Sequence, residues 1–208
     1  MDIELAGTKE RIFDISIRLF AKKGFEKVSV RDIAHEAGIK AASIYNHFSG
    51  KDVILDTIYE YFRVHRLDNR GASIHMKETI ETGTAIEIVN ALADTPFELE
   101  EKITIRMVLI PKIILMRIYD DPKANQFFLH EWYDTDMKYL RHWLGYAISI
   151  RRLPGDFDIE RYSMFFWRQL VMMAVWAFAD PGYEVRVVDE EKLLHNMFAD
   201  MLPLKEPL

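Results

Sequence analysis

The sequence contains no cysteine, and this absence removes several kinds of site at once. A disulfide scaffold, a catalytic thiolate and a cysteine-based zinc or iron–sulfur centre are all excluded. At 208 residues the chain is long enough to bury a hydrophobic core without such cross-links. A reducing compartment is compatible with this composition.

Long hydrophobic runs are also missing. The longest apolar stretch covers residues 170–179, well short of the roughly 20 residues that a helix needs to cross a bilayer. The N-terminal segment MDIELAGTKER carries acidic residues where a signal peptide has basic ones, and it has no apolar segment of the usual length. We therefore expect a cytoplasmic protein with no membrane partner.

Positive charge is scarce overall but is distributed unevenly. The net charge is −6, yet residues 1–51 carry nine Lys and Arg against seven Asp and Glu, whereas residues 52–208 carry 18 against 26. The opening segment is thus the basic part, as expected if it approaches a nucleic acid. A solvated basic surface with no partner explains a difference of this size equally well.

Two short helical patterns separated by one glycine occupy residues 29–52 and predict a helix-turn-helix. Ser29 is a good N-cap for the first helix, and Gly38 supplies the positive φ that ends it. A second helix is expected from Lys40 to Phe48. Plotted at about 100° per residue, its packed face is predicted to contain Ala41, Ile44, Tyr45 and Phe48.

The opposite side of this second helix is predicted to face outward. Its residues are small, hydrogen-bonding or basic, namely Lys40, Ala42, Ser43, Asn46 and His47. Such a surface suits the major groove of DNA.

The remainder of the chain reads as helical, because no alternation typical of a strand extends beyond a few residues. We therefore predict an all-α fold, with a helix-turn-helix domain over residues 1–51 and a helical domain over residues 52–208. Turn and capping signals predict helices at residues 8–23, 51–67, 95–119, 121–150, 158–179 and 189–202.

The segment LFAKKGFEKVSV followed by RDIAHEAGIKAASIYNHFSGKDVIL resembles the N-terminal DNA-binding domain of TetR-family transcriptional regulators. The resemblance covers roughly residues 8–60. It implies a three-helix head joined by a fourth helix to an all-helical body that binds ligand and forms the dimer. It also implies a homodimeric repressor that leaves its DNA operator when a small-molecule effector binds the body.

The resemblance implies a DNA-contacting set composed of the start of the first helix, the second helix and the lysine after it. These residues are Ser29, Arg31, Lys40, Ala41, Ala42, Ser43, Tyr45, Asn46, His47 and Lys51. Within this set Ser29 could serve only as an N-cap and Tyr45 only as a core ring. Because Ala41 and Ala42 offer no hydrogen bond, base readout is expected to depend on the longer polar side chains or on DNA shape.

A ligand site in the body is expected among large apolar side chains and two arginines that interrupt apolar helices. The candidates are Arg106, Met107, Phe128, Trp132, Trp167, Arg168 and Met172. Filling of the protein's own core accounts for most of them equally well. For Arg106 and Arg168 the alternatives are a structural pair with an acid, or an anchor for an anionic ligand or the dimer interface.

The resemblance implies a dimer interface on the last two helices. Its candidate residues are Tyr162, Phe165, Phe166, Met173, Trp176, Leu194, Met197 and Phe198. The body's own core is the alternative location for each of these side chains.

Catalytic motifs are not evident, since the chain has no glycine-rich phosphate loop, HExxH or GxSxG sequence. His130 and Asp134 lie one helical turn apart, but two ligands are too few for a metal site. We expect no enzyme activity, no metal and no cofactor. A protein-interaction module that keeps the helix-turn-helix without using it on DNA remains an alternative.

Overall fold

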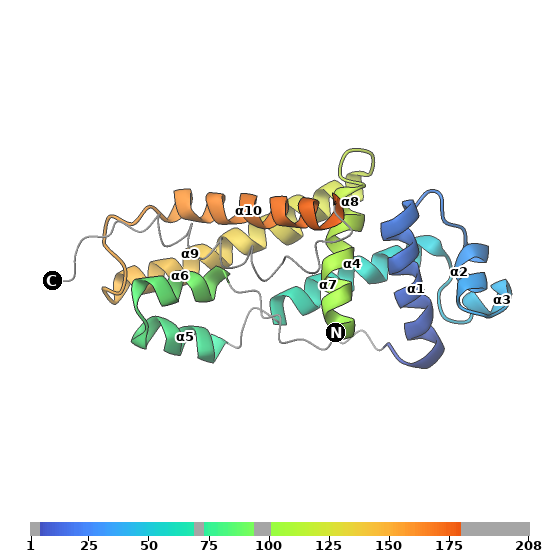
Figure 1. Cartoon of the computed structure of the whole chain (residues 1–208), viewed down its shortest axis with the longest axis horizontal. Coiled ribbons are helices and arrows are strands. Elements are labelled where there is room, and N and C mark those ends of the chain that lie inside the picture. Colours follow the sequence, from blue (N-terminus) through green and yellow to red (C-terminus); the bar gives the residue numbers. More distant parts are fainter. Residues whose placement is uncertain (1–4, 69–72, 94–100, 180–208) are drawn as a thin grey trace. The chain divides into compact units, whose positions relative to one another are not determined.

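The computed structural model describes residues 5–68, 73–93 and 101–179, and in these ranges all regular structure is helical (Figure 1). The chain divides into two compact units. The first contains α1 (Gly7–Lys23), α2 (Val30–Glu36), α3 (Ala41–Ile44), α4 (Lys51–Asp68), α7 (Glu101–Leu115) and α8 (Pro122–Gln126). The second contains α5 (Ser73–Thr82), α6 (Ala85–Ala93), α9 (Asp134–Ser149) and α10 (Ile159–Ala179).

Helix α1 confirms the first predicted element. Ile12, Phe13 and Phe20 recur at helical spacing on one side, and each is fully buried. The helix ends at Gly24, whose φ is +82° and whose N–H donates to the carbonyl of Phe20 at 2.9 Å. The buried side of α1 packs against α2 and α7.

Arg106 of α7 forms the polar centre of the first unit. Its side chain is only 7% exposed, and its guanidinium donates to Asp14 at 2.7 Å and to Glu10 at 2.8 Å, both on α1. A third N–H donates to the hydroxyl of Tyr61 on α4 at 3.1 Å. Burial lowers the pKa of Arg106, but the hydrogen bonds to Asp14, Tyr61 and Glu10 outweigh it, so the net shift is upward. Arg106 is therefore a structural ion-pair residue, which was one of the two alternatives predicted for it, and these contacts do not support its place among the ligand candidates.

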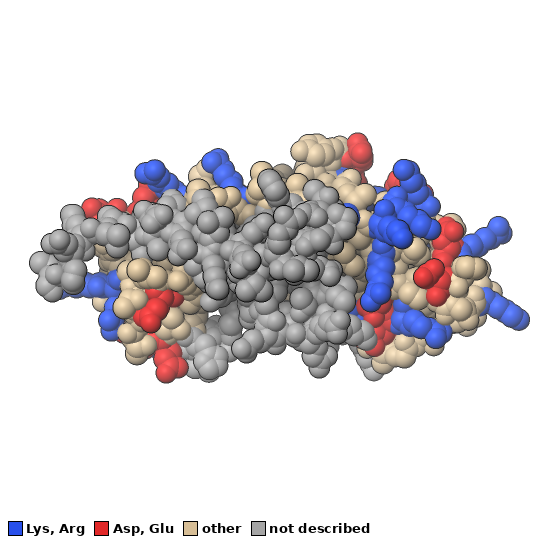
Figure 2. Space-filling view, viewed as in Figure 1, with Lys and Arg blue, Asp and Glu red and all other residues tan. Residues whose placement is uncertain are grey.

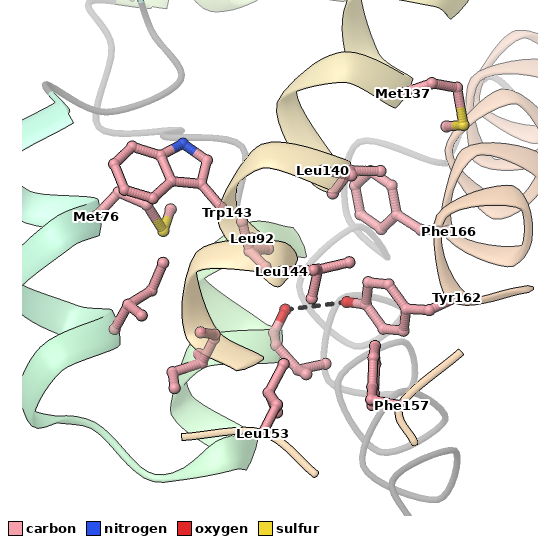
Figure 3. Packing of buried hydrophobic residues seen from close by; sticks show 14 residues of the cluster. Met76, Leu92, Met137, Leu140, Trp143, Leu144, Leu153, Phe157, Tyr162 and Phe166 are labelled. Carbon is pink, nitrogen blue, oxygen red and sulfur yellow. Dashed lines mark hydrogen bonds between the residues drawn. The ribbon is translucent and has the colours of Figure 1, made fainter. Parts of the chain in front are cut away.

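The second unit has its own hydrophobic core between α5, α6, α9 and α10 (Figure 3). Leu140 and Leu144 of α9 are fully buried there, together with Tyr162 and Phe166 of α10. The Tyr162 hydroxyl donates to the carbonyl of Val89 on α6 at 3.2 Å, as Figure 3 shows. Desolvation by burial raises the pKa of Tyr162 far above its usual range.

Helix α4 begins at Lys51 as expected, and α10 matches the prediction within one residue. The helix expected over residues 121–150 is instead divided into α8, a π-helical stretch at Phe127–Tyr133 and α9. The helix expected to reach residue 119 ends at Leu115. The expected start of that helix, at residues 95–98, and the helix expected at 189–202 lie outside the described residues.

We predict that Arg106→Met lowers the free energy of unfolding by about 2–4 kcal/mol, because it leaves two partly buried carboxylates without their cation. The matched control is Arg141→Met, whose partner Glu160 is exposed. This control is expected to change stability by less than about 1 kcal/mol. Urea unfolding followed by circular dichroism measures both, and equal effects would show that Arg106 does not hold α1 to α7.

Candidate functional site

A capping box fixes the start of α2. The Ser29 hydroxyl accepts the N–H of Asp32 at 3.2 Å, and the Asp32 carboxylate accepts the N–H of Ser29 at 2.7 Å. The Ser29 hydroxyl also donates to this carboxylate. These hydrogen bonds from Ser29 lower the pKa of Asp32. The side chain of Ser29 is thus used within the chain, as the N-cap prediction required.

The turn after α2 follows the predicted pattern. Gly38 has a φ of +63°, which only glycine adopts readily. The next N–H, that of Ile39, donates to the carbonyl of Ala34 at 3.0 Å and closes the end of α2. Figure 1 shows the resulting succession of α2 and α3 beside α1.

Helix α3 is shorter than the nine residues expected. After Ile44 the backbone tightens, because the N–H of Asn46 donates to Ser43 and that of His47 donates to Ile44, each three residues back. Ile44 and Phe48 still reach the core, as predicted.

Tyr45 is the main error in the predicted packing of this segment. Its ring was expected on the packed face, but the residue is 57% exposed. Tyr45 is the residue at which α3 ends, so a helical wheel drawn through residue 48 no longer describes the direction of its side chain. The ring therefore belongs to the outward surface.

The outward surface consists of the predicted DNA-contacting residues of α2, α3 and the adjoining turns that the core does not cover. Its exposed members are Arg31, Lys40, Ala42, Tyr45, Asn46 and His47, and Ala41 and Ser43 are partly exposed. Figure 2 shows Lys and Arg side chains projecting from the end of the first unit that carries α1–α3, with acidic side chains among them. We call these eight residues the recognition surface.

Lys51, expected to contact DNA, makes two contacts within the first unit. Its ammonium donates to the carbonyl of Phe25 at 2.9 Å and lies 4.0 Å from the centre of the Phe25 ring. The guanidinium of Arg117 also lies against this ring, at 4.2 Å. Lys51 therefore helps to hold the turn between α1 and α2.

Arg117 was missed by reasoning from the sequence. Its guanidinium pairs with Asp121 at 2.6 Å and with Glu26 at 3.1 Å, so it joins the end of α7 to the turn after α1. Asp121, four residues after Arg117, was the one signal available in the sequence. The contact between Arg117 and Phe25 joins residues far apart in the chain, so no local pattern predicts it.

The expected ligand residues do not all come together. Trp132 and Trp167 lie 6.4 Å apart, and Tyr133 lies 4.7 Å from Trp167, measured between ring centres in the second unit. Arg168 and Met172 are exposed, which contradicts their expected places in an enclosed pocket. Phe128 is half-buried in the π-helical stretch, and the side chain of Met107 lies outside the described residues.

The expected dimer residues also need correction. Tyr162 and Phe166 are buried in the core of the second unit, and Phe165 packs against that core. The exposed apolar side chains of α10 are Met164, Met172 and Val175, none of which was among the dimer candidates. The remaining candidates are outside the described residues, as side chains (Met173, Trp176) or entirely (Leu194, Met197, Phe198).

The described part of the chain contains neither a membrane-spanning helix nor a cluster of metal ligands. No helix there is long and apolar enough to cross a membrane. No group of three or more potential metal ligands occurs among the same residues.

Comparison with known proteins gives a consistent result for the N-terminal part. Residues 12–58 match the family model described as bacterial regulatory proteins, tetR family. The HTH-type transcriptional regulator YerO of Bacillus subtilis, itself uncharacterised, is 32% identical over 158 residues, which are 73% of this chain and 51% of YerO. The chain spans about half the length of the curated relatives it matches first.

Two further similarities concern one kind of regulator. The HTH-type transcriptional repressor KstR2 of Rhodococcus jostii is 40% identical over 57 residues, covering 27% of this chain and 28% of KstR2. The solved structure of the ketosteroid transcriptional regulator KstR2 of Mycobacterium tuberculosis has a TM-score of 0.68 over 96% of both chains, at 16% identity. The structural similarity extends the common fold to the second unit.

We predict that Asp121→Asn lowers stability at neutral pH by about 1.5–3 kcal/mol, the range for a hydrogen bond to a charged group. Burial raises the pKa of Asp121, but the hydrogen bonds from Arg117 and Lys123 give a net shift below its usual value. A lowered folded-state pKa stabilises the protein above the unfolded-state value, and this contribution is lost as the pH falls through the folded-state value.

Asparagine is also a good N-cap, so Asp121→Asn tests the charge separately from the cap of α8. Urea unfolding at pH 7 and at stepwise lower pH should show the difference from wild type shrinking toward zero in acid. Glu160→Gln, in an exposed pair, is the control and should have little effect. A difference that persists unchanged in strong acid would refute the assigned charge contribution.

Proposed function

We propose that this chain, which belongs to the TetR family of bacterial regulatory proteins, is a dimeric transcriptional repressor that binds operator DNA. The observation that carries the proposal is the separation of buried and exposed side chains within residues 29–48. Ile33, Ala34, Ile44 and Phe48 are buried, while the recognition surface is turned to solvent. In a helix-turn-helix with this arrangement, the apolar side chains are buried in the protein and the polar face is available to the major groove of DNA.

Several contacts with DNA follow from the chemistry of the recognition surface. Arg31 is long enough to donate to a guanine, and Asn46 has the paired donor and acceptor that fit an adenine. Tyr45 and His47 carry polar groups that suit phosphate oxygens, which set docking without reading sequence. Ser29 is not assigned a contact, because its hydroxyl is held by Asp32.

The middle of the recognition surface is chemically sparse. Ala41 and Ala42 have no donor or acceptor in their side chains, although a methyl group can contact the methyl of thymine. We therefore expect much of the specificity to come from Arg31 and Asn46 at the two ends and from the shape of the DNA.

Regulation by a small molecule is the second part of the proposal. An effector bound in the second unit would favour a form of the dimer whose recognition surfaces no longer match half-sites about 34–36 Å apart. Repression would then be lifted. The cluster of Trp132, Tyr133 and Trp167 supports this unit as the ligand-binding one, since aromatic side chains commonly line such sites.

We predict that Lys40→Ala weakens binding to all DNA sequences and flattens the dependence of log affinity on log salt by about one unit, as expected for loss of one phosphate contact. Lys40 is preferable to Lys51, whose replacement would also release Phe25. Lys77→Ala is the control, because Lys77 is exposed in the second unit and faces Glu81.

The measurement is a gel-shift series, at several salt concentrations, on the DNA upstream of this protein's own gene. Unchanged affinity and salt slope in Lys40→Ala would refute the assigned surface. Absence of any specific site there and at neighbouring promoters would count against the proposed repression of its own gene.

We predict that Met172→Glu converts the dimer to monomer at micromolar concentration, because a second copy would cover the apolar side chains Met164, Met172 and Val175, which are exposed on α10. Met116→Glu is a matched control in the first unit: Met116 is 49% exposed and Met172 is 52% exposed. Light scattering coupled to gel filtration distinguishes the two. A Met172→Glu variant that stays dimeric would exclude this side of α10 as the interface.

A further inference from the structure

Helices α9 and α10 are paired antiparallel, and two contacts fix their register. Trp132 meets Trp167 near one end of the pair, and Arg141 donates to Glu160 at 2.6 Å further along. Asp136 follows Trp132 by one helical turn, and Ser163 precedes Trp167 by one turn. The register therefore brings Asp136 and Ser163 to the same level, between the two contacts.

Both of these polar side chains are completely buried. Asp136 and Ser163 are each 0% exposed, in a unit whose surroundings are mainly apolar. The Ser163 hydroxyl has no hydrogen-bond partner in the described structure, and neither does the buried amide oxygen of Asn90 on α6. Because buried polar atoms are nearly always hydrogen-bonded, the Ser163 hydroxyl points to a bound group that the described residues do not supply.

Aromatic rings adjoin this polar level. Tyr133 and Trp167 are only partly buried, so the cluster reaches solvent, and the planes of these two rings are inclined at 81°. Tryptophan and tyrosine faces attract cations, and tryptophan does so most strongly. Trp132 and Tyr133 belong to the π-helical stretch, a conformation that is frequent at functional sites.

The charges nearby favour one sign of ligand. The buried polar side chains that the register brings to this level are a carboxylate and a hydroxyl. A carboxylate has about four acceptor positions, enough for a ligand beside its contacts within the chain. The two arginines expected to anchor an anion are elsewhere: Arg106 is held by Glu10 and Asp14 in the first unit, and Arg168 is exposed.

We propose that the second unit binds an organic ammonium ion, with its N–H groups directed to Asp136 and Ser163 and its hydrocarbon part against Trp132, Tyr133 and Trp167. This inference rests on the proposed ligand-binding function and specifies the chemical class of the effector. Burial of the ammonium beside a carboxylate supplies the selectivity for positive charge, since a neutral or anionic analogue leaves these acceptors unsatisfied.

Isothermal titration calorimetry of the full chain with three probes that share a 4-alkylphenol frame tests the proposal. The probes are 4-(2-aminoethyl)phenol, which is cationic, 4-propylphenol, which is neutral, and 3-(4-hydroxyphenyl)propanoate, which is anionic. We expect the cation to bind at least about tenfold more tightly than either analogue, the factor that loss of one charged hydrogen bond produces. Equal binding of the neutral probe, tighter binding of the anion, or no binding of any probe would overturn the proposal.

Variants locate the binding site. Asp136→Asn should bring the ratio of cation to neutral affinity close to one, and Ser163→Ala should weaken the cation several-fold while leaving 4-propylphenol unchanged. Ser149→Ala is the control, because its exposed hydroxyl bonds only to its own turn. Should Asp136→Asn fail to fold, Ser163→Ala alone decides, and a cation affinity equal to that of the control would refute the site.

A gel shift with the same protein and no probe separates this inference from the proposed function. Specific DNA binding without a preference for the cation would reject the ligand class and leave the regulator proposal standing. Cation binding without any DNA binding would reject the regulator proposal and leave the assigned ligand class standing.

Discussion

The buried guanidinium of Arg106 is the interaction on which the first unit depends. It joins α7 to two acids of α1 and to a tyrosine of α4, so three helices that are far apart in sequence share one charged centre. The centres of the Phe13 and Tyr61 rings lie 5.3 and 5.0 Å from the guanidinium carbon of Arg106. Because α1 packs behind α2, whatever holds α1 also supports the recognition surface.

A second cationic contact acts closer to that surface. Phe25, in the turn that leads into α2, meets the ammonium of Lys51 and the guanidinium of Arg117. Since Lys51 begins α4 and Arg117 follows α7, the same two helices that meet at Arg106 also reach this turn. The first unit therefore fixes the helix-turn-helix from both its α1 side and its entry turn, and the recognition surface is left for a partner.

Local features were the ones predictable from sequence. The extent of α1, the Ser29 cap, the Gly38 turn and the start of α4 depend on short-range hydrogen bonds and helical periodicity, and each was predicted. Features that depend on distant partners were not. The ion pairs of Arg106 join residues more than 90 apart in sequence, and nothing local distinguishes such an arginine from a ligand anchor.

The candidate sites show the same limit. A helical wheel assumes an uninterrupted helix at about 100° per residue, so it could not foresee the end of α3 at Ile44 or the π-helical stretch that contains Trp132. Nor could it divide the aromatic side chains of α10 between core and surface, because that division depends on which side of α10 meets α6 and α9. The DNA-contacting roles of the exposed residues remain predictions.

The claim that the recognition surface reads a specific DNA site is tested most directly by selection of bound fragments from a random DNA pool. The account predicts enrichment of a twofold-symmetric sequence with half-sites about one helical turn apart, through repeated rounds at near-physiological salt. It also predicts that an Arg31→Ala protein loses preference at one position of each half-site. A pool that remains random, or a symmetric site selected equally well by Arg31→Ala and Asn46→Ala proteins, would contradict it.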